Sequence, residues 1–435
     1  MSHGWLSKVE KSLEEVKNDM QEFLLLQEKI INLNYNNYDE IRDFIIHEYV
    51  EQKLSPDMKQ TFLHILSQSV NIKPQKFPLY KTLVLNIFSH PSAKNNVKMT
   101  KLQIQNCNWT HDYYELLINI SDSPPDENDA KNNSKFLKYS QQSTDIGNQV
   151  HEALLDDNID KFQELYSQNE IRDLKISINM MNINFAGDFL TLFEAAALYS
   201  ASNIFNFLWI QQTEDENDQL HEQLFFCAIA GGNSEILIPL ENFFLKRNNN
   251  LAKNDQVIYD EHCLNIALSF HNYDVVDYIH NNFKIPYNMD ILLSCLEYNN
   301  IISFISIIQE IPYILKNVKT MKRLIITAFK VGELRLAKFL VEFCPDTIDL
   351  DALYDDSPNG DNPLHYAISY NCTDLIKYLV GSGKMSIYRR NKLGYSPKET
   401  ARLYQSLDAA KYLDLLIPEE TQAKEKPKKV IIVVD

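Results

Sequence analysis

The chain has 435 residues, and 45% of them are hydrophobic, which is enough for a sizeable folded core. Its 42 basic and 59 acidic residues leave a net charge of −17, and the basic ones gather only in short runs such as Arg389-Arg390. Because nucleic acids and anionic membranes are met by clustered lysine and arginine, this balance argues against both as partners. With only 10 glycines, it also argues against phosphate-binding loops.

The first residues, MSHGWLSKVEKSLEEV, lack the apolar core of a secretory signal. No apolar run reaches the ~18 residues that a membrane-spanning helix needs. The six cysteines are far apart, and none stands in a CxxC pair, which is typical of buried thiols in a reducing compartment. We therefore expect a cytoplasmic protein, and the lysine-rich stretch 424–429 leaves a nuclear location open.

Residues 1–120 predict a helical N-terminal region. In WLSKVEKSLEEVKNDMQEFLLLQEKIINL, large apolar residues recur every three or four positions. Ser55 is a natural N-cap, and Pro56 fits the first position of another helix. FPLYKTLVLNIF and HDYYELLINI are two further apolar segments.

The stretch SDSPPDENDAKNNSK is rich in proline, aspartate and asparagine and nearly free of large apolar residues. This composition is typical of a solvated linker or a long loop. We place a linker at 121–145 and, with it, the boundary between two domains.

Beyond the linker, the chain repeats itself around one small residue, here called the anchor. The six clear anchors are Ala196, Ala228, Ala267, Ala328, Ala367 and Ala401, and weaker copies surround Ala153 and Cys295. Large apolar residues stand three before most anchors and twelve after them. A small anchor lets two helices of a pair approach closely, and units too small to bury their own faces must stack.

The fourth residue after each anchor predicts where the first helix of the pair ends. This column reads Ser200, Gly232, His271, Asn299, Gly332, Asn371 and Gln405. Glycine and asparagine tolerate the left-handed backbone conformation that ends a helix. We therefore expect a helix-ending turn at this position in every repeat.

The pattern resembles the ankyrin repeat, whose signature includes T-P-L-H-x-A. NGDNPLHYAISYNCTDLIKYLVGSGK is the closest copy, although Asn362 replaces the threonine and no other copy keeps Pro-Leu-His. The degenerate style is similar to large ankyrin proteins of trichomonad protists, which carry a helical N-terminal region and a domain of unknown function. The resemblance implies an all-α solenoid of about eight repeats over 146–417. The residues that carry it are Ala196, Ala228, Ala267, Ala328, Pro363, Leu364, His365, Ala367 and Ala401.

His365 raises the question of catalysis, because histidine is the commonest general base. A catalytic or metal site needs a nucleophile or a second ligand within one helical turn, and none is present. The resemblance implies instead that His365 bonds to backbone in the turns between repeats, with Pro363 at the first helical position. We find no constellation that predicts an enzyme, a metal or a cofactor.

The third residue after the anchor is aromatic in five of seven copies. These residues are Tyr199, Phe270, Tyr298, Tyr370 and Tyr404. By resemblance, they lie at the end of the inner helix, on the concave groove where ankyrin proteins often hold partners. Tyrosine dominates many binding hot spots, but stacking of the rings from repeat to repeat explains the column equally well.

The chain ends in EKPKKVIIVVD, within a tail over 418–435. Its β-branched residues predict a β-strand at 430–434, which includes Val430, Ile431, Ile432 and Val433. The run resembles short motifs that add a strand to ubiquitin-like modifiers. Docking on the protein's own body, or a loose end, is the alternative.

Together these features predict a protein-binding scaffold or adaptor that holds a protein or peptide on the concave face of the solenoid. The net charge favours a basic or neutral partner over an acidic one. The alternative is a substrate receptor in a ubiquitin-type pathway, in which the N-terminal helices or the C-terminal strand dock a partner.

Overall fold

A computed structural model describes most of the repeat region and much of the N-terminal region. The described residues are 2–34, 36–52, 62, 65, 66, 69, 73, 76–92, 145–168, 171–177, 189–211, 222–248, 259–344, 347–352, 359–383 and 385–416. The helices expected after Ser55 and over 111–120, nearly all of the linker and the tail strand lie outside these residues.

The N-terminal region begins with a long helix. Its elements are α1 (Ser2–Ile31), α2 (Tyr38–Ile45), the π-helical turn η1 (Ile46–Val50) and α4 (Phe77–Ser89). The bounds of α4 coincide closely with the predicted segment FPLYKTLVLNIF.

Eight helix pairs follow within the described residues, and each anchor lies in the first helix of its pair. The pairs are α10 (Asp145–Leu155) and α11 (Ile159–Gln168), α12 (Leu192–Leu198) and α13 (Ser202–Gln211), α15 (Glu222–Gly231) and α16 (Ser234–Asn248), α17 (Glu261–Ser269) and α18 (Tyr273–Phe283), α19 (Met289–Glu297) and α20 (Ile301–Glu310), α21 (Val318–Lys330) and α22 (Leu334–Glu342), α23 (Pro363–Ser369) and α24 (Thr373–Gly381), and α25 (Pro397–Leu403) and α26 (Leu407–Leu416). We call the first helix of each pair the inner helix and the second the outer helix.

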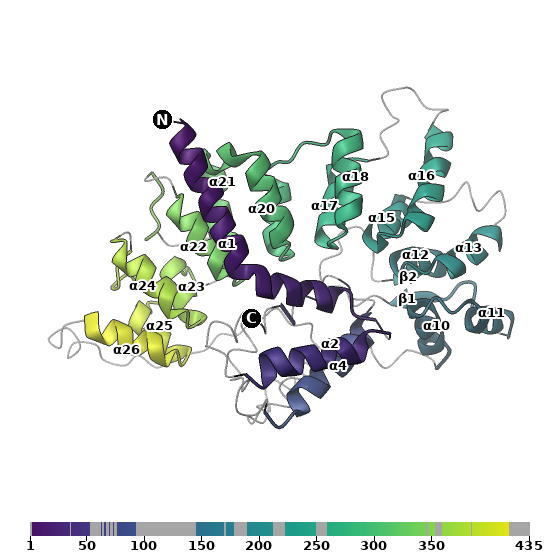
Figure 1. The fold of residues 1–435 in the computed structure, drawn as a ribbon, viewed down its shortest axis with the longest axis horizontal. Coiled ribbons are helices and arrows are strands. Elements are labelled where there is room, and N and C mark those ends of the chain that lie inside the picture. The colour runs from purple at the N-terminus through teal and green to yellow at the C-terminus, as the bar shows by residue number, and fades with distance from the viewer. Residues whose placement is uncertain are drawn as a thin grey trace.

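The pairs stack in an arc that runs from α10 and α11 to α25 and α26 (Figure 1). From α12 onward, each inner helix packs on the next one, whereas neighbouring outer helices touch less regularly. The inner helices therefore form the more continuously packed row. The fold is therefore an all-α solenoid of stacked helix pairs.

Two short elements interrupt the helical pattern. The 3₁₀ turn η4 (Pro312–Lys316) joins α20 to α21. A two-stranded antiparallel hairpin, β1 (Lys175–Ser177) and β2 (Phe189–Thr191), precedes α12. Thr191 then begins α12 in a capping box with Glu194, which satisfies free N–H groups at the start of that short helix.

Each anchor is completely or almost completely buried, so the inner helices approach closely through small side chains. The predicted helix-ending column is confirmed, because all seven residues have φ between 53° and 77°. At the pair α17 and α18, the N–H of Asn272 donates to the Ala267 carbonyl at 3.0 Å, and the N–H of His271 donates to the Leu268 carbonyl at 3.2 Å. This is the Schellman arrangement, which satisfies the last carbonyls of a helix.

At four of the seven turns, the residue after the left-handed one joins its repeat to the repeat before it. Side chains at this position donate to carbonyl groups at the end of the preceding inner helix or in the turn that follows it, and we call these residues the turn ladder. Asn233 donates to the Ser200 carbonyl at 3.1 Å, Asn272 to Ile229 and Ala230 at 2.7 and 2.8 Å, Asn300 to Leu268 at 2.8 Å, and Ser406 to Ile368 at 2.7 Å. The turn ladder therefore adds directional contacts to the apolar stacking of the repeats.

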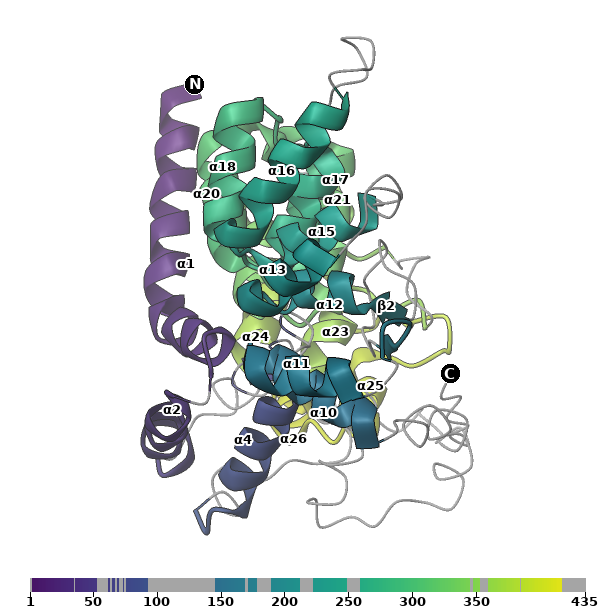
Figure 2. The same cartoon turned by 90° about the vertical axis from the view of Figure 1, so that its right-hand side faces the viewer.

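Helix α1 belongs to two hydrophobic cores. Val9, Leu13 and Met20 are buried in the core of the repeats, whereas Phe23 and Leu26 are buried with α2, η1 and α4 in a second core. The N-terminal half of α1 packs against the outer helices α20 and α22. Figure 2 shows α1 along the flank of the array where α18 and α20 lie. The repeat core thus extends into the predicted N-terminal region.

The contacts of this helix are both aromatic and polar. Trp5 stacks on Tyr313 at 5.9 Å between ring centroids, and Lys8 pairs with Glu342 at 3.2 Å. Further along, Gln27 donates to the Asn299 carbonyl at 3.1 Å. The ammonium of Lys73, beyond α1, donates to Asn272 Oδ1 at 2.7 Å. The N-terminal region therefore docks on the turns of consecutive repeats.

Candidate protein-binding face

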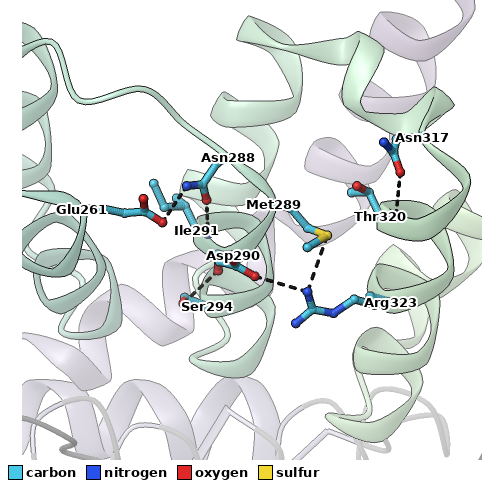
Figure 3. Close-up of polar contacts among 9 residues, drawn as sticks. All are labelled: Glu261, Asn288, Met289, Asp290, Ile291, Ser294, Asn317, Thr320 and Arg323. Atoms are coloured by element: carbon cyan, nitrogen blue, oxygen red, sulfur yellow. Dashed lines mark hydrogen bonds and ion pairs between the residues drawn. The ribbon is translucent and has the colours of Figure 1, made fainter.

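The inner helices in the middle of the array begin at side-chain caps. Asn288 Oδ1 accepts from the N–H of Ile291 at 3.0 Å, and Asn317 Oδ1 accepts from the N–H of Thr320 at 3.0 Å (Figure 3). Such caps satisfy N–H groups that a helix leaves free in its first turn. They fix where α19 and α21 begin and, with that, which residues their surfaces expose.

Polar side chains link three successive inner helices at these ends. Asn288 Nδ2 donates to Glu261 Oε1 at 2.6 Å, which joins α19 to α17, and Arg323 pairs with Asp290 at 3.3 Å, which joins α21 to α19 (Figure 3). The pair of Arg323 and Asp290 is solvent-exposed, so it adds little stability. The side chains of Arg323 and Asp290 are therefore accessible to a binding partner.

Two turns further along, the same helices expose a second pair of charges. Asp290 and Glu297 are seven residues apart on α19, and Arg323 and Lys330 are seven apart on α21. Residues seven apart lie on one side of a helix. We call these four exposed residues the α19–α21 face, which carries acidic groups on one helix and basic groups on the next.

Although the Glu297 side chain is exposed at the surface, its carboxyl group is partly covered by the protein, and this partial desolvation raises its pKa. The charges of Arg323 and Lys330 act in the opposite direction and lower it. The carboxylate is therefore close enough to the basic helix to respond to it. Arg323 and Lys330 on α21 therefore act electrostatically on Glu297 on α19.

His365 lies inside the array and is only 1% exposed. Its Nδ1 lies 2.6 Å from Asn362 Oδ1, and its Nε2 lies 3.2 Å from the Tyr395 carbonyl in the following repeat. Pro363 stands in the first turn of α23, after the cap Asn362. The ring of His365 thus ties two turns together.

The aromatic column caps the inner helices at their C-terminal ends and differs in exposure along the array. Tyr199 is 8% exposed and Phe270 is 3% exposed. The Tyr199 hydroxyl lies 3.1 Å from His151 Nδ1, and the ammonium of Lys73 lies 5.9 Å from the centre of the Phe270 ring. These two rings offer little surface to a partner.

Tyr298, Tyr370 and Tyr404 are half-buried and keep part of their surface. The Tyr370 hydroxyl donates to the Lys330 carbonyl at 3.1 Å, so this ring bridges two repeats. Their role in partner binding stays a prediction. The tail residues Val430, Ile431, Ile432 and Val433 lie outside the described residues.

A family model for ankyrin repeats matches residues 314–416 with three copies. Residues 314–416 are ankyrin repeats. This repeat is a protein–protein interaction module, and its all-helical fold is typically non-catalytic. The finer resemblance to trichomonad ankyrin proteins stays a prediction.

Other comparisons add little. No curated protein matches the chain. One similar solved structure is a predatory endopeptidase from Bdellovibrio bacteriovorus in complex with an immunity protein, at 16% identity, covering 61% of this chain and 97% of that one, with a TM-score of 0.20. That score supports no conclusion about this chain. Among the described residues, no helix is both long and apolar enough to cross a membrane.

The apolar pattern of the repeats does not point to the four residues of the α19–α21 face. Two of them, Asp290 and Arg323, stand five before their anchors, and the other two stand two after. A search for charges at fixed distances from the anchors would have found them.

Proposed function

We propose that this protein is a scaffold or adaptor that binds a protein or peptide segment on the concave side of its solenoid, at the α19–α21 face. The observation that carries this proposal is the exposure of Asp290 and Glu297 on one inner helix beside Arg323 and Lys330 on the next. Exposed charges of this kind orient an approaching partner and speed its association.

The arrangement of charges also suggests what the partner carries. A segment lying across α19 and α21 meets acidic groups first and basic groups next. A complementary segment therefore carries basic residues followed by acidic ones. This narrows the expectation, based on the net charge of −17, that the partner is basic or neutral.

The test is selection of peptides from a displayed random library on the full-length chain, followed by affinity measurement on charge variants. The double variant Asp290→Arg with Arg323→Asp exchanges the two signs while keeping both groups. Selected peptides should lose at least about tenfold in affinity, since one wrong charge pair costs about 1.4 kcal/mol or more. Peptides with exchanged charges should recover it.

A matched control is the pair Asp274→Asn and Asp277→Asn on the outer helix α18, where both side chains are exposed. These substitutions change the net charge without touching the concave side, so peptide affinity should stay the same. Equal losses in both variants would show general electrostatics only and would contradict the proposed face.

The half-buried aromatic residues are proposed as further contacts beside this face. Replacing Tyr298 and Tyr370 with serine tests this, because both rings keep exposed surface. Loss of peptide affinity with an unchanged fold would assign them to binding. Unchanged affinity would leave them as stacking elements of the scaffold.

A second candidate is a substrate receptor in a ubiquitin-type pathway, with residues 1–120 as the docking domain and 146–417 as the substrate-binding domain. Its support is the second hydrophobic core around Phe23 and Leu26, which gives the N-terminal helices a packing centre of their own. Affinity capture of the full chain, with and without 425–435, tests it. Absence of ligase subunits from both captures would reject this candidate.

A further inference from the structure

An acidic residue, Glu333, stands at a position that other repeats fill with a member of the turn ladder. Glu333 follows the left-handed Gly332, as Asn272 follows His271 and Asn300 follows Asn299. Its backbone repeats the same pattern, because the N–H of Glu333 donates to the Ala328 carbonyl at 3.0 Å. Amide and hydroxyl side chains at this position donate a hydrogen, but an ionised carboxylate has none to donate.

The surroundings of Glu333 disfavour a negative charge. The side chain is only 4% exposed, and burial raises the pKa of its carboxyl group to about 7. The Arg335 charge and the backbone N–H groups of Arg335 and Leu336 lower that pKa, but burial outweighs them. The guanidinium of Arg335 faces the ring of Phe23 at 4.5 Å.

The neighbouring elements add no further charge that acts on this carboxyl group among the described residues. Close by, Phe23 of α1 faces Arg335, and Gln27 of α1 donates to the carbonyl of Asn299, so these contacts bring no further charge. Lys330 at the end of α21 acts on Glu297 instead. The side-chain oxygen and nitrogen of Asn299 are both buried without a hydrogen-bond partner. The turn at Asn299 therefore holds buried polar atoms that are not satisfied.

We propose that Glu333 carries a proton in the folded protein and donates it to the carbonyl end of α19, which makes the junction between the pairs α19–α20 and α21–α22 a pH-sensitive point of the array. Asn300 and Ser406 donate to the carbonyls of Leu268 and Ile368, each of which directly follows the anchor of the preceding repeat. The residue at the same place in the repeat before Glu333 is Leu296, so we assign its carbonyl as the acceptor. Loss of the proton places two acceptors face to face in a buried site, which is unfavourable.

The direction of the effect follows from proton linkage. Between the ordinary glutamate pKa near 4.5 and the raised value near 7, the folded chain holds one more proton than the unfolded chain. The contribution of Glu333 to stability therefore falls as pH rises through this window and stays low above it. Other groups titrate in the same range, so the effect is measured as a difference between variants.

The experiment is the melting temperature of the full chain and of Glu333→Gln at pH values from 5 to 8.5. Glutamine has nearly the same size and always offers a donor. The two chains should melt together at pH 5, and the variant should melt about 5 °C higher above pH 8. A difference in melting temperature that does not change with pH would overturn the proposal.

Glu164→Gln is the matched control, since Glu164 is an exposed residue of α11. Its melting temperature should follow the unaltered chain at every pH. A second measurement needs no variant: hydrogen-exchange protection, corrected for intrinsic rates, of the turns at Asn299 and Gly332. Their protection should fall between pH 6 and 8 while that of the turn at Asn371 stays constant, and a uniform change would overturn the proposal.

Discussion

Gly332 is a residue whose lack of a side chain decides the geometry of a turn. Its φ is +77°, and an added Cβ would lie 3.0 Å from the ring of Tyr370. We expect Gly332→Ala to lower the free energy of unfolding by about 1–2 kcal/mol, because a left-handed alanine is strained. Denaturant unfolding followed by circular dichroism measures the loss.

Gly381 provides the control at the end of α24. An added Cβ there meets nothing within 4 Å, and its backbone is not left-handed. Gly381→Ala should raise the free energy of unfolding by about 0.4–1 kcal/mol through the unfolded chain. The same sign for both variants would contradict the role assigned to the Gly332 turn.

The burial of His271 should make the folding stability of the middle repeats sensitive to acid. Its Nε2 lies 2.9 Å from the Tyr298 carbonyl, and burial lowers the pKa of the imidazole to about 4. Between pH 6.5 and 4 the unfolded chain binds the extra proton, so stability falls as pH falls through that range, by up to about 3 kcal/mol.

His271→Asn removes this titration and keeps a residue that tolerates the left-handed conformation. The loss of stability between pH 6.5 and 4 should then shrink, as measured by urea midpoints at each pH. A variant that loses as much stability on acidification as the unaltered chain would show that other groups dominate.

Residues differ in how far the sequence predicts them. The left-handed column, from Ser200 to Gln405, was predictable because backbone preference is local. The proton proposed for Glu333 was not, because nothing in the local sequence shows that the fold removes water from that carboxyl group. Tyr199 and Phe270 illustrate the same limit, since their spacing predicts a column but not its burial.

At the scale of elements, helix α1 contacts residues that are far from it in the sequence, such as Glu342. Leu13 is fully buried in the repeat core, whereas Leu25 on the same helix is 45% exposed. Leu13→Ala should lower the free energy of unfolding by about 2–5 kcal/mol, through lost burial and a cavity. Leu25→Ala should change it by less than about 0.5 kcal/mol.

Hydrogen exchange gives the local measurement for this pair of variants. Leu13→Ala should increase exchange in α1 more than in α23 and α24, which α1 does not pack against closely. Equal effects of the two alanine substitutions would show that the N-terminal half of α1 is not held by the repeats.

The bounds of most repeat helices were predictable, because caps such as Asn288 and Asn362 lie within a few residues of the N–H groups that they satisfy. The docking of α1 was not. Its apolar stripe predicts a buried face but not the partner, and Glu342, which pairs with Lys8, lies more than 300 residues away along the chain.

At the scale of the whole molecule, Lys73 connects the N-terminal region to the solenoid through its hydrogen bond to Asn272. Burial lowers the pKa of its ammonium to about 7, and the nearby charge of Lys76 lowers it further. Between pH 7 and 10.5 the unfolded chain binds more protons, so the contribution of Lys73 to stability rises with pH in that range.

Lys73→Met should flatten the rise in stability between pH 7 and 9.5, since methionine fills a similar space and carries no proton. Lys81→Met, at an exposed position of α4, should leave the rise unchanged. Urea midpoints at intervals of pH measure both, and a rise that persists in Lys73→Met would assign it to another group.

Helix α1 also has a mechanical consequence. A solenoid can be stretched elastically, because each repeat contacts only its neighbours and small tilts between repeats add up along the array. Because α1 packs on both α20 and α22, it bridges two successive repeats and should stiffen the junction between them. When the two ends of the array are pulled apart, the pairs from α10 to α16 and from α23 to α26 should lengthen first, because the N-terminal region does not pack closely on them.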